Sequence, residues 1–209
     1  MPRAPFIPTA DPYHIAVRCI NKEWFLSLPE TWEIMSSNLY LVKHFYGLQI
    51  YNFVLMSNHF HLIVAAPELN LSPAMNYFLR ETSRQTMKAS HRVSGTFTKR
   101  FFRSRIGTEG YFRSAYKYVY RNPVEVGLSK WVEEYPFSTL SGILGVSKLI
   151  LPIEPDRFLF ESDVEKTLAW LNRPGSEENR LSIQKALRRS EFRLPRVRGQ
   201  AHPLETELY

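Results

Sequence analysis

The chain has 209 residues, of which 44% are hydrophobic and 22% charged; this balance is ordinary for a soluble globular protein and excludes a disordered chain. Lysine and arginine number 27 against 20 aspartate and glutamate, and the formal net charge of +7 favours an anionic partner, either nucleic acid or an anionic membrane surface. The single cysteine, Cys19, excludes a disulfide within the chain and a thiolate metal cluster. The sequence contains no bilayer-length apolar run and no apolar signal region, so we expect an intracellular, soluble protein.

The first half of the chain alternates strand and helix patterns. Apolar residues at Trp32, Met35, Leu39 and Val42 recur at helical spacing, and Gly47 suits the end of that helix. Following a proline-rich arm over residues 1–12, the predicted elements are a strand at 13–20, a helix at 29–47, strands at 48–55 and 59–66, and a helix from the N-cap Ser72 to about Ser90. Residues 57 and 58 are the turn of a hairpin.

The next segment contains a basic, aromatic strand-and-loop stretch at 93–106 and a helix from Thr108 to about Asn122, where Pro123 disfavours continuation. This order predicts an α+β fold, a ferredoxin-like antiparallel sheet with helices packed on it. We therefore place the main domain at 1–150, which also contains the candidate catalytic residues described below. Residues 151–209 form a small, mostly helical, basic C-terminal appendage and tail, with a helix opening at Ser162 and another at about 178–189.

The sharpest local motif is Asn58-His59-Phe60-His61-Leu62. On a strand, residues two apart point to one face, so His59 and His61 would lie together while Phe60 and Leu62 face the core. Two imidazoles at this spacing can hold one divalent metal ion, although a third ligand is needed. Two polar residues on a half-exposed strand explain the same spacing equally well.

A second motif lies on the last helix of the main domain. Tyr118 and Asn122 are four residues apart and therefore neighbours on one flank of that helix. If the helix packs on the sheet, the phenol could attack a metal-bound phosphate and the amide oxygen could complete the metal site. Tyrosines on amphipathic helices are more often core or rim residues, which is the plainer explanation.

The motifs together resemble a known family. His59-Phe60-His61 resembles the His-hydrophobic-His signature of HUH endonucleases, and residues 118–128 resemble the tyrosine helix of REP-associated tyrosine transposases. Trp131 and Tyr135-Pro136-Phe137-Ser138-Thr139 resemble the segment that follows in that family. The resemblance covers about residues 10–145. Arg121 and Val126 depart from the pattern without removing a catalytic group.

The resemblance implies a function. The chain would be a metal-dependent single-stranded DNA endonuclease and strand transferase that forms a 5′-phosphotyrosine intermediate, acting on hairpin, repetitive palindromic DNA in the cytoplasm, at the nucleoid. Tyr118 would be the nucleophile, with Tyr120 as its competitor. The ligands of the metal, Mg²⁺ or Mn²⁺, would be His59, His61 and Asn122. Neither a monomer nor a homodimer is favoured.

Basic residues interleaved with aromatic ones predict contact with single-stranded DNA, because cations bind phosphates and flat rings stack on bases. A second basic run occupies the appendage, where seven cations between Arg180 and Arg198 face one acid, Glu191. The residues that we expect to bind DNA are Arg100, Arg103, Arg105, Arg113, Arg121, Arg188 and Arg189.

Two alternatives compete with this hypothesis. The first is a non-catalytic protein that binds single-stranded DNA or RNA hairpins, such as a domesticated transposase, because ferredoxin-like sheets often bind nucleic acid through aromatic residues. The second is a metal-dependent hydrolase with a water nucleophile. A hydrolase would need an acidic group near the histidines, and Glu68 is the nearest candidate in the sequence.

Overall fold

The computed structural model describes residues 7–25, 27–90, 95–97, 101–154, 163–200 and 202–206. Its centre is a four-stranded antiparallel sheet in the order β2-β3-β1-β4. The strands are β1 (Tyr13–Arg18), β2 (Gln49–Leu55), β3 (His59–Ala65) and β4 (Phe102–Arg105). With α1 (Leu28–Tyr46) and α2 (Leu71–Ser90) between them, they form the βαββαβ unit of a ferredoxin-like fold, which confirms the predicted fold class.

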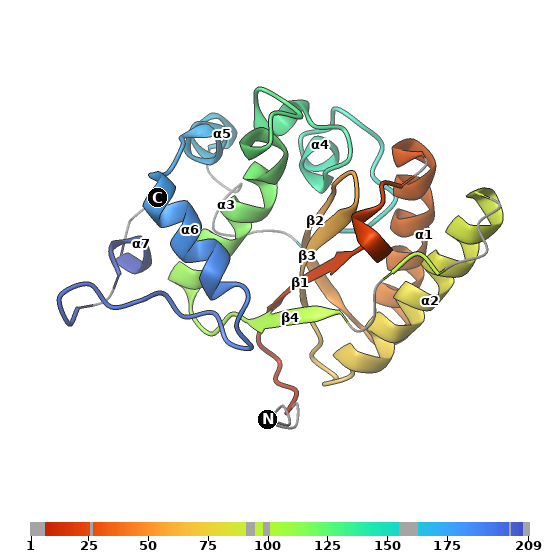
Figure 1. Ribbon diagram of the computed structural model, residues 1–209, viewed down its shortest axis with the longest axis horizontal. Helices are drawn as coiled ribbons and strands as arrows, with labels where there is room; N and C mark the ends of the chain where they lie inside the picture. Colours follow the sequence, from red (N-terminus) through yellow and green to blue (C-terminus); the bar gives the residue numbers. More distant parts are fainter. Residues whose placement is uncertain are drawn as a thin grey trace.

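The two faces of the sheet carry different cores. Helices α1 and α2 lie on one side of the sheet and α3 (Glu109–Glu125) on the other (Figure 1). The alternation of β3 separates these cores, because Phe60, Leu62 and Val64 pack with α1 and α2, whereas Ile63 packs with α3. The predicted apolar face of β3 is therefore confirmed, and its opposite face is directed at α3.

Local signals set most helix ends. The hydroxyl of Ser27 accepts from the backbone N–H of Glu30 at the start of α1, and Gly47 ends that helix with a φ of 62°. Thr108 caps α3 as predicted. Two predictions are wrong: α2 begins at Leu71, which places Ser72 inside its first turn, and α3 continues through Pro123 to Glu125. Pro123 has no backbone N–H, so the last turns of α3 lack one helical hydrogen bond.

The C-terminal residues complete the core on the α3 side. The elements that follow α3 are the 3₁₀ turns of η2 (Val132–Glu134) and the helices α4 (Thr139–Ile143), α5 (Val164–Asn172), α6 (Glu177–Ala186) and α7 (Pro203–Thr206). Leu171, Leu187 and Phe192 are buried with Tyr116 and Val119 of α3. Figure 1 shows α5, α6 and α7 gathered beside α3. The predicted cap Ser162 lies outside the described residues, and Asp163 caps α5.

Segments after α3 also pair with the outer strands of the sheet. The backbone N–H of Leu55 donates to the carbonyl of Phe137, and the hydroxyl of Thr139 accepts from the N–H of Phe53. On the opposite edge, Arg105 exchanges backbone hydrogen bonds with residues 190 and 192. The family-like segment 135–139 therefore covers part of the β2 edge, a role that its sequence did not indicate. In the part of the chain that the structure describes, no helix could cross a membrane.

Candidate active site

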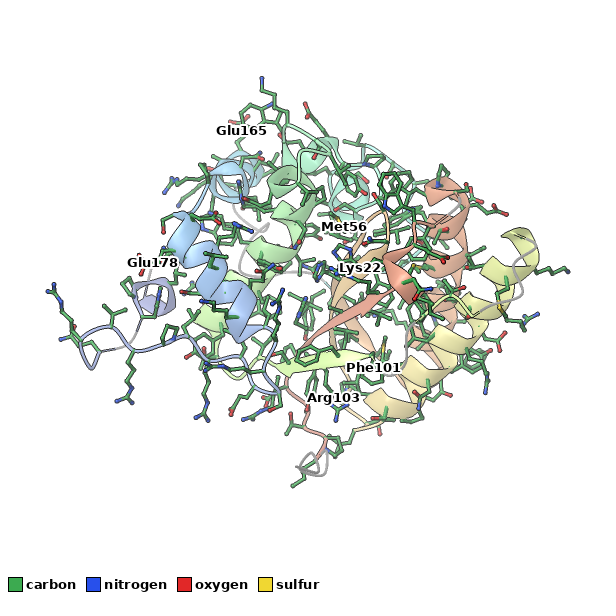
Figure 2. All side chains as sticks on the ribbon, viewed as in Figure 1. Lys22, Met56, Phe101, Arg103, Glu165 and Glu178 are labelled. Carbon is green, nitrogen blue, oxygen red and sulfur yellow. The ribbon has the colours of Figure 1, made fainter. Side chains whose placement is uncertain are left out.

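His59 and His61 lie together on the face of β3 that is directed at α3. Their ring centroids are 5.0 Å apart, and His61 is 6% exposed. Both histidines line a cavity of about 570 Å³ between the sheet, α3 and α6. Met56, labelled in Figure 2, lines the same cavity. The predicted sharing of one face is thus observed.

Helix α3 brings Tyr118 and Asn122 to the same cavity. The Tyr118 ring centroid is 5.7 Å from that of His61, and the rings are perpendicular. The side-chain amide of Asn122 donates to the backbone carbonyl of Tyr118 over 2.7 Å. Tyr120, by contrast, is 1% exposed and its hydroxyl lies 3.0 Å from that of Thr139 in the core. Of the two tyrosines, only Tyr118 lines the cavity.

The imidazoles in this cavity are neutral at neutral pH. Burial lowers the pKa of His59 to about 4, with a further contribution from the Arg18 guanidinium. Burial also lowers the pKa of His14, on β1, to about 3. The pKa of His61 lies well below its usual 6.5, first because of burial and then because of the neighbouring His14 and His59. Neutral imidazoles are the form that binds a metal ion.

The sequence did not predict that the appendage would contribute to this cavity. Gln184 of α6 lines the cavity together with Tyr118. Burial raises the pKa of the Tyr118 phenol, whereas Gln184, Arg188, Asn122 and Arg180 oppose that rise. A sequence signal exists in retrospect, since Arg180, Gln184 and Arg188 follow at four-residue intervals. Arg180 and Gln184 lie on one face of α6, and Arg188 lies just beyond its end.

The cavity is basic. Seven cationic side chains line it against one carboxylate, that of Glu125: Arg18, Arg113, Lys117, Arg121, Arg173, Arg180 and Arg188. Three of these, Arg113, Arg121 and Arg188, were predicted as DNA-binding residues. A concave surface with this excess of positive charge attracts phosphates.

The other arginines predicted to bind DNA lie elsewhere. Arg105 forms ion pairs with Asp11 and Glu191. Arg103 lies over the Phe101 ring, 5.7 Å from its centroid, at the β4 edge (Figure 2). Arg189 is exposed just beyond α6 and does not line the cavity. Arg100 lies outside the described residues.

Arg121 has a structural role that its sequence position did not reveal. It is 8% exposed, and its guanidinium donates to Glu125 and to the backbone carbonyls of Leu171 and Asn172. These carbonyls belong to the last turn of α5, where helical partners are missing. Arg121 therefore joins the tyrosine helix to the appendage, and its donors are engaged within the chain.

The donor set suits a divalent metal ion. His59 and His61 supply two neutral imidazoles, and Asn122 supplies an amide oxygen in the same cavity. Among the described residues, no group of three or more His, Cys, Asp or Glu side chains could hold a metal. Mn²⁺ tolerates such a mixed nitrogen and oxygen set better than Mg²⁺, which prefers oxygen.

Comparison with known proteins identifies the family. A family model described as transposase IS200 like matches residues 11–122, more than half of the chain. The chain belongs to the IS200-like transposase family. The matched range contains His59, His61, Tyr118 and Asn122, so the resemblance inferred from the motifs is confirmed for the family. No curated protein matches the chain.

Two solved transposase structures resemble this IS200-like chain. The first is a REP-associated tyrosine transposase bound to a REP hairpin, with a TM-score of 0.59 and 22% sequence identity over 84% of this chain and 92% of that one. The second is a putative transposase from Deinococcus radiodurans, with a TM-score of 0.41 and 14% identity over 57% of this chain and 95% of that one. The likeness to the REP-associated tyrosine transposase shows that the two proteins share a fold.

The role of Arg121 predicts a large effect on stability. Replacing Arg121 by Leu should lower the free energy of unfolding by about 3 kcal/mol, because Glu125 and two carbonyls lose a charged donor. Arg113→Leu is the matched control on the same helix: it removes only an i,i+4 pair with Glu109, worth about 0.5 kcal/mol. Urea unfolding measures both. Equal midpoints for the two variants would contradict the assignment.

The buried histidines predict a loss of stability in acid. Since the unfolded chain has histidine pKa values near 6.5 and the folded cavity lowers them, the unfolded state binds more protons below pH 6.5. The stabilisation is present above pH 6.5 and is lost as pH falls toward 4, by about 1.4 kcal/mol for each unit of lowering.

Urea unfolding of the metal-free protein at pH 7 and pH 5, with EDTA, measures this loss. The exposed histidine His44, replaced by Gln, is the control and should leave the difference between the two pH values unchanged. A free energy of unfolding that stays constant between pH 7 and 5 would argue against neutral buried imidazoles.

Proposed function

We propose that this transposase-family chain is a metal-dependent endonuclease and strand transferase of single-stranded DNA, with Tyr118 as its nucleophile. The observation that carries the proposal is the meeting of Tyr118, His61 and His59 in one basic cavity, with the Tyr118 ring 5.7 Å from that of His61. Family membership supports the class of reaction. Chemistry of this kind places a nucleophile, two metal ligands and phosphate-binding cations side by side.

In the proposed reaction the Tyr118 oxygen attacks the phosphorus of a phosphodiester. The bond from phosphorus to the 3′ oxygen breaks, that oxygen leaves as a 3′-OH after taking a proton, and the 5′ phosphate stays on the tyrosine. A 3′-OH of another strand then attacks the phosphotyrosine, which releases the phenol and joins the strands. One phosphoester replaces another in each step, so no nucleotide cofactor is needed.

Side chains of the cavity would act on both reacting groups, the phosphate and the Tyr118 phenol. His59, His61 and Asn122 would hold Mg²⁺ or Mn²⁺, which supplies Lewis-acid chemistry at the phosphate when bound. The phenol must lose its proton, and its burial raises the pKa. Gln184 and the positive charges of Arg188 and Arg180 oppose this rise in the pKa and so favour the phenolate that attacks.

The substrate class follows from charge and from the structural relative. The relative that shares this fold was captured with a REP hairpin, and we infer that this chain also acts on hairpin DNA with a flanking single strand. The cations of α6 and the residues after it would help to hold the phosphates. This segment therefore belongs to the proposed DNA-binding surface as well as to the cavity.

The structure bears differently on the two competing functions, the hydrolase with a water nucleophile and the non-catalytic binding protein. Glu68, which the hydrolase hypothesis needs, lies beside Gly47 beyond the end of β3, and the strand from His61 to Ala65 alone spans roughly 13 Å. A water nucleophile activated by Glu68 is therefore not favoured. The non-catalytic binding protein stays the second candidate, since the basic cavity alone would serve it. A covalent adduct separates it from the transferase.

The nucleophile is tested by trapping this adduct. Wild-type protein, Tyr118→Phe and Tyr120→Phe are incubated with labelled single-stranded hairpins from the DNA flanking the gene, with Mn²⁺ or Mg²⁺. We expect a metal-dependent covalent band on denaturing gels that Tyr118→Phe abolishes and Tyr120→Phe retains. A band lost only with Tyr120→Phe would move the nucleophile. Tight hairpin binding without any band would favour the binding protein.

The cavity arginines are tested by the salt dependence of DNA binding. Arg188 lines the cavity, whereas its neighbour Arg189 is exposed outside it, so the two make a matched pair. Arg188→Gln should reduce the slope of log affinity against log salt by about 0.7 for a single-stranded oligonucleotide. Arg189→Gln should change the slope less. Fluorescence anisotropy at several salt concentrations measures both, and equal slopes would contradict a phosphate contact in the cavity.

A further inference from the structure

Each of the two proposed metal-binding histidines is held through its Nδ1 atom. The Nδ1 of His59 lies 2.8 Å from Oδ1 of Asn58, and the Nδ1 of His61 lies 2.9 Å from Nε2 of His14. Both distances are those of a hydrogen bond. Since an imidazole has only two nitrogens, contacts at Nδ1 leave Nε2 as the atom available to a metal ion.

The Asn58 contact has a fixed direction. The Nδ2 of Asn58 lies 3.1 Å from the backbone carbonyl of Lys22, which can only accept a hydrogen bond, so the amide nitrogen faces Lys22 and the amide oxygen faces His59. That oxygen also can only accept. His59 must therefore donate from Nδ1, and in the neutral ring its Nε2 carries a lone pair.

His14 is placed to do the same for His61. His61 is opposite Ala16 across β1 and β3, and His14, two residues from Ala16, therefore lies diagonally across on the same face. The His14 and His61 rings are inclined by only 21°, with centroids 5.1 Å apart. With the nitrogens 2.9 Å apart, the rings meet nearly in plane, where the lone pair of one nitrogen points at the proton of the other.

We propose that His14 and Asn58 are positioning residues that accept the Nδ1 protons of His61 and His59 and so direct both Nε2 lone pairs at one divalent metal ion. The inference rests on the proposed metal site. In the opposite arrangement His14 would donate, and the proton of His61 would sit on Nε2, where it would block coordination. A hydrogen-bond acceptor behind a ligating histidine orients the ring and fixes its tautomer.

The burial of His14 fits this role better than a packing role. The side chain is 2% exposed, and among the described residues its Nδ1 has no hydrogen-bond partner. A buried polar atom without a partner costs about 1–3 kcal/mol, which an apolar ring of similar shape would avoid. An imidazole at position 14 can form the hydrogen bond with His61. A phenylalanine there could not.

The tautomers are tested first, in the metal-free protein, by two-bond ¹⁵N–¹H correlation spectra of ¹⁵N-histidine-labelled protein at neutral pH. We expect the protons of His59 and His61 on Nδ1 in the wild type. In His14→Phe, the proton of His61 should move to Nε2 while His59 stays unchanged. In His14→Gln, whose Oε1 can occupy the place of Nε2, the proton of His61 should stay on Nδ1. A wild-type His61 proton on Nε2 would overturn the role of His14.

Metal binding is tested next with Mn²⁺ alone, by calorimetry or by loss of the free-Mn²⁺ resonance signal. His14→Phe should bind Mn²⁺ about 10- to 100-fold more weakly than the wild type, and His14→Gln should restore the affinity. Asn58→Leu should weaken binding over the same range. Thermal unfolding in EDTA checks that each variant folds, and exposed His44→Gln is the matched histidine control.

The outcomes separate this inference from the proposed function. Folded His14→Phe and Asn58→Leu proteins that bind Mn²⁺ like the wild type would overturn the positioning roles and leave the metal site intact. A wild-type protein that binds no Mn²⁺ would overturn both the metal site and the inference. Weak binding by His14→Phe together with equally weak binding by His14→Gln would mean that shape, and not the acceptor, is what His14 provides.

Discussion

The two-residue repeat of β3 is the constraint on which the rest of the structure depends. Phe60, Leu62 and Val64 must face α1 and α2 to build one core, and this fixes the register of the strand. His59 and His61 are thereby committed to the opposite face, beneath α3. A slip of one residue would place the histidines among the apolar side chains of the α1 and α2 core and turn three large hydrophobic ones toward α3 and the basic cavity. The stability of the sheet and the position of the site thus depend on the same register.

Sequence alone predicted the parts of the molecule that depend on short-range patterns. The sheet, the two covering helices and the shared face of His59 and His61 follow from periodicity within single elements, and the i,i+4 spacing of Tyr118 and Asn122 placed both on one flank of α3. Contacts between distant elements were not predictable in this way. His14 precedes His61 by 47 residues, and Gln184 follows Tyr118 by 66, so only the folded chain brings them together.

The arginines illustrate the same limit. The charge count correctly indicated an excess of cations. It could not show which cationic side chains are bound to other groups of the folded chain. Arg105 and Arg121 are tied to carboxylates and carbonyls of their own chain, and Arg180 forms ion pairs with Glu177 and Glu125. Arg18, Arg173 and Arg180, which the motif analysis did not choose as DNA-binding residues, all line the cavity. A guanidinium has five donors in a fixed plane. The groups that lie within reach of those donors, and not the charge itself, therefore decide whether an arginine binds the carbonyls at a helix end or a phosphate.

The pairing of both outer strands bears on how copies of the chain can associate. An open strand edge is a template onto which another molecule can add its own strand. Here part of the β2 edge is covered by residues 137–139, and the end of β4 is covered by residues 190–192. A second molecule could add a strand at these places only after the covering segment of the first molecule had been displaced. Residues 190–192 thus occupy backbone positions at the end of β4 that a chain truncated before them would leave unpaired.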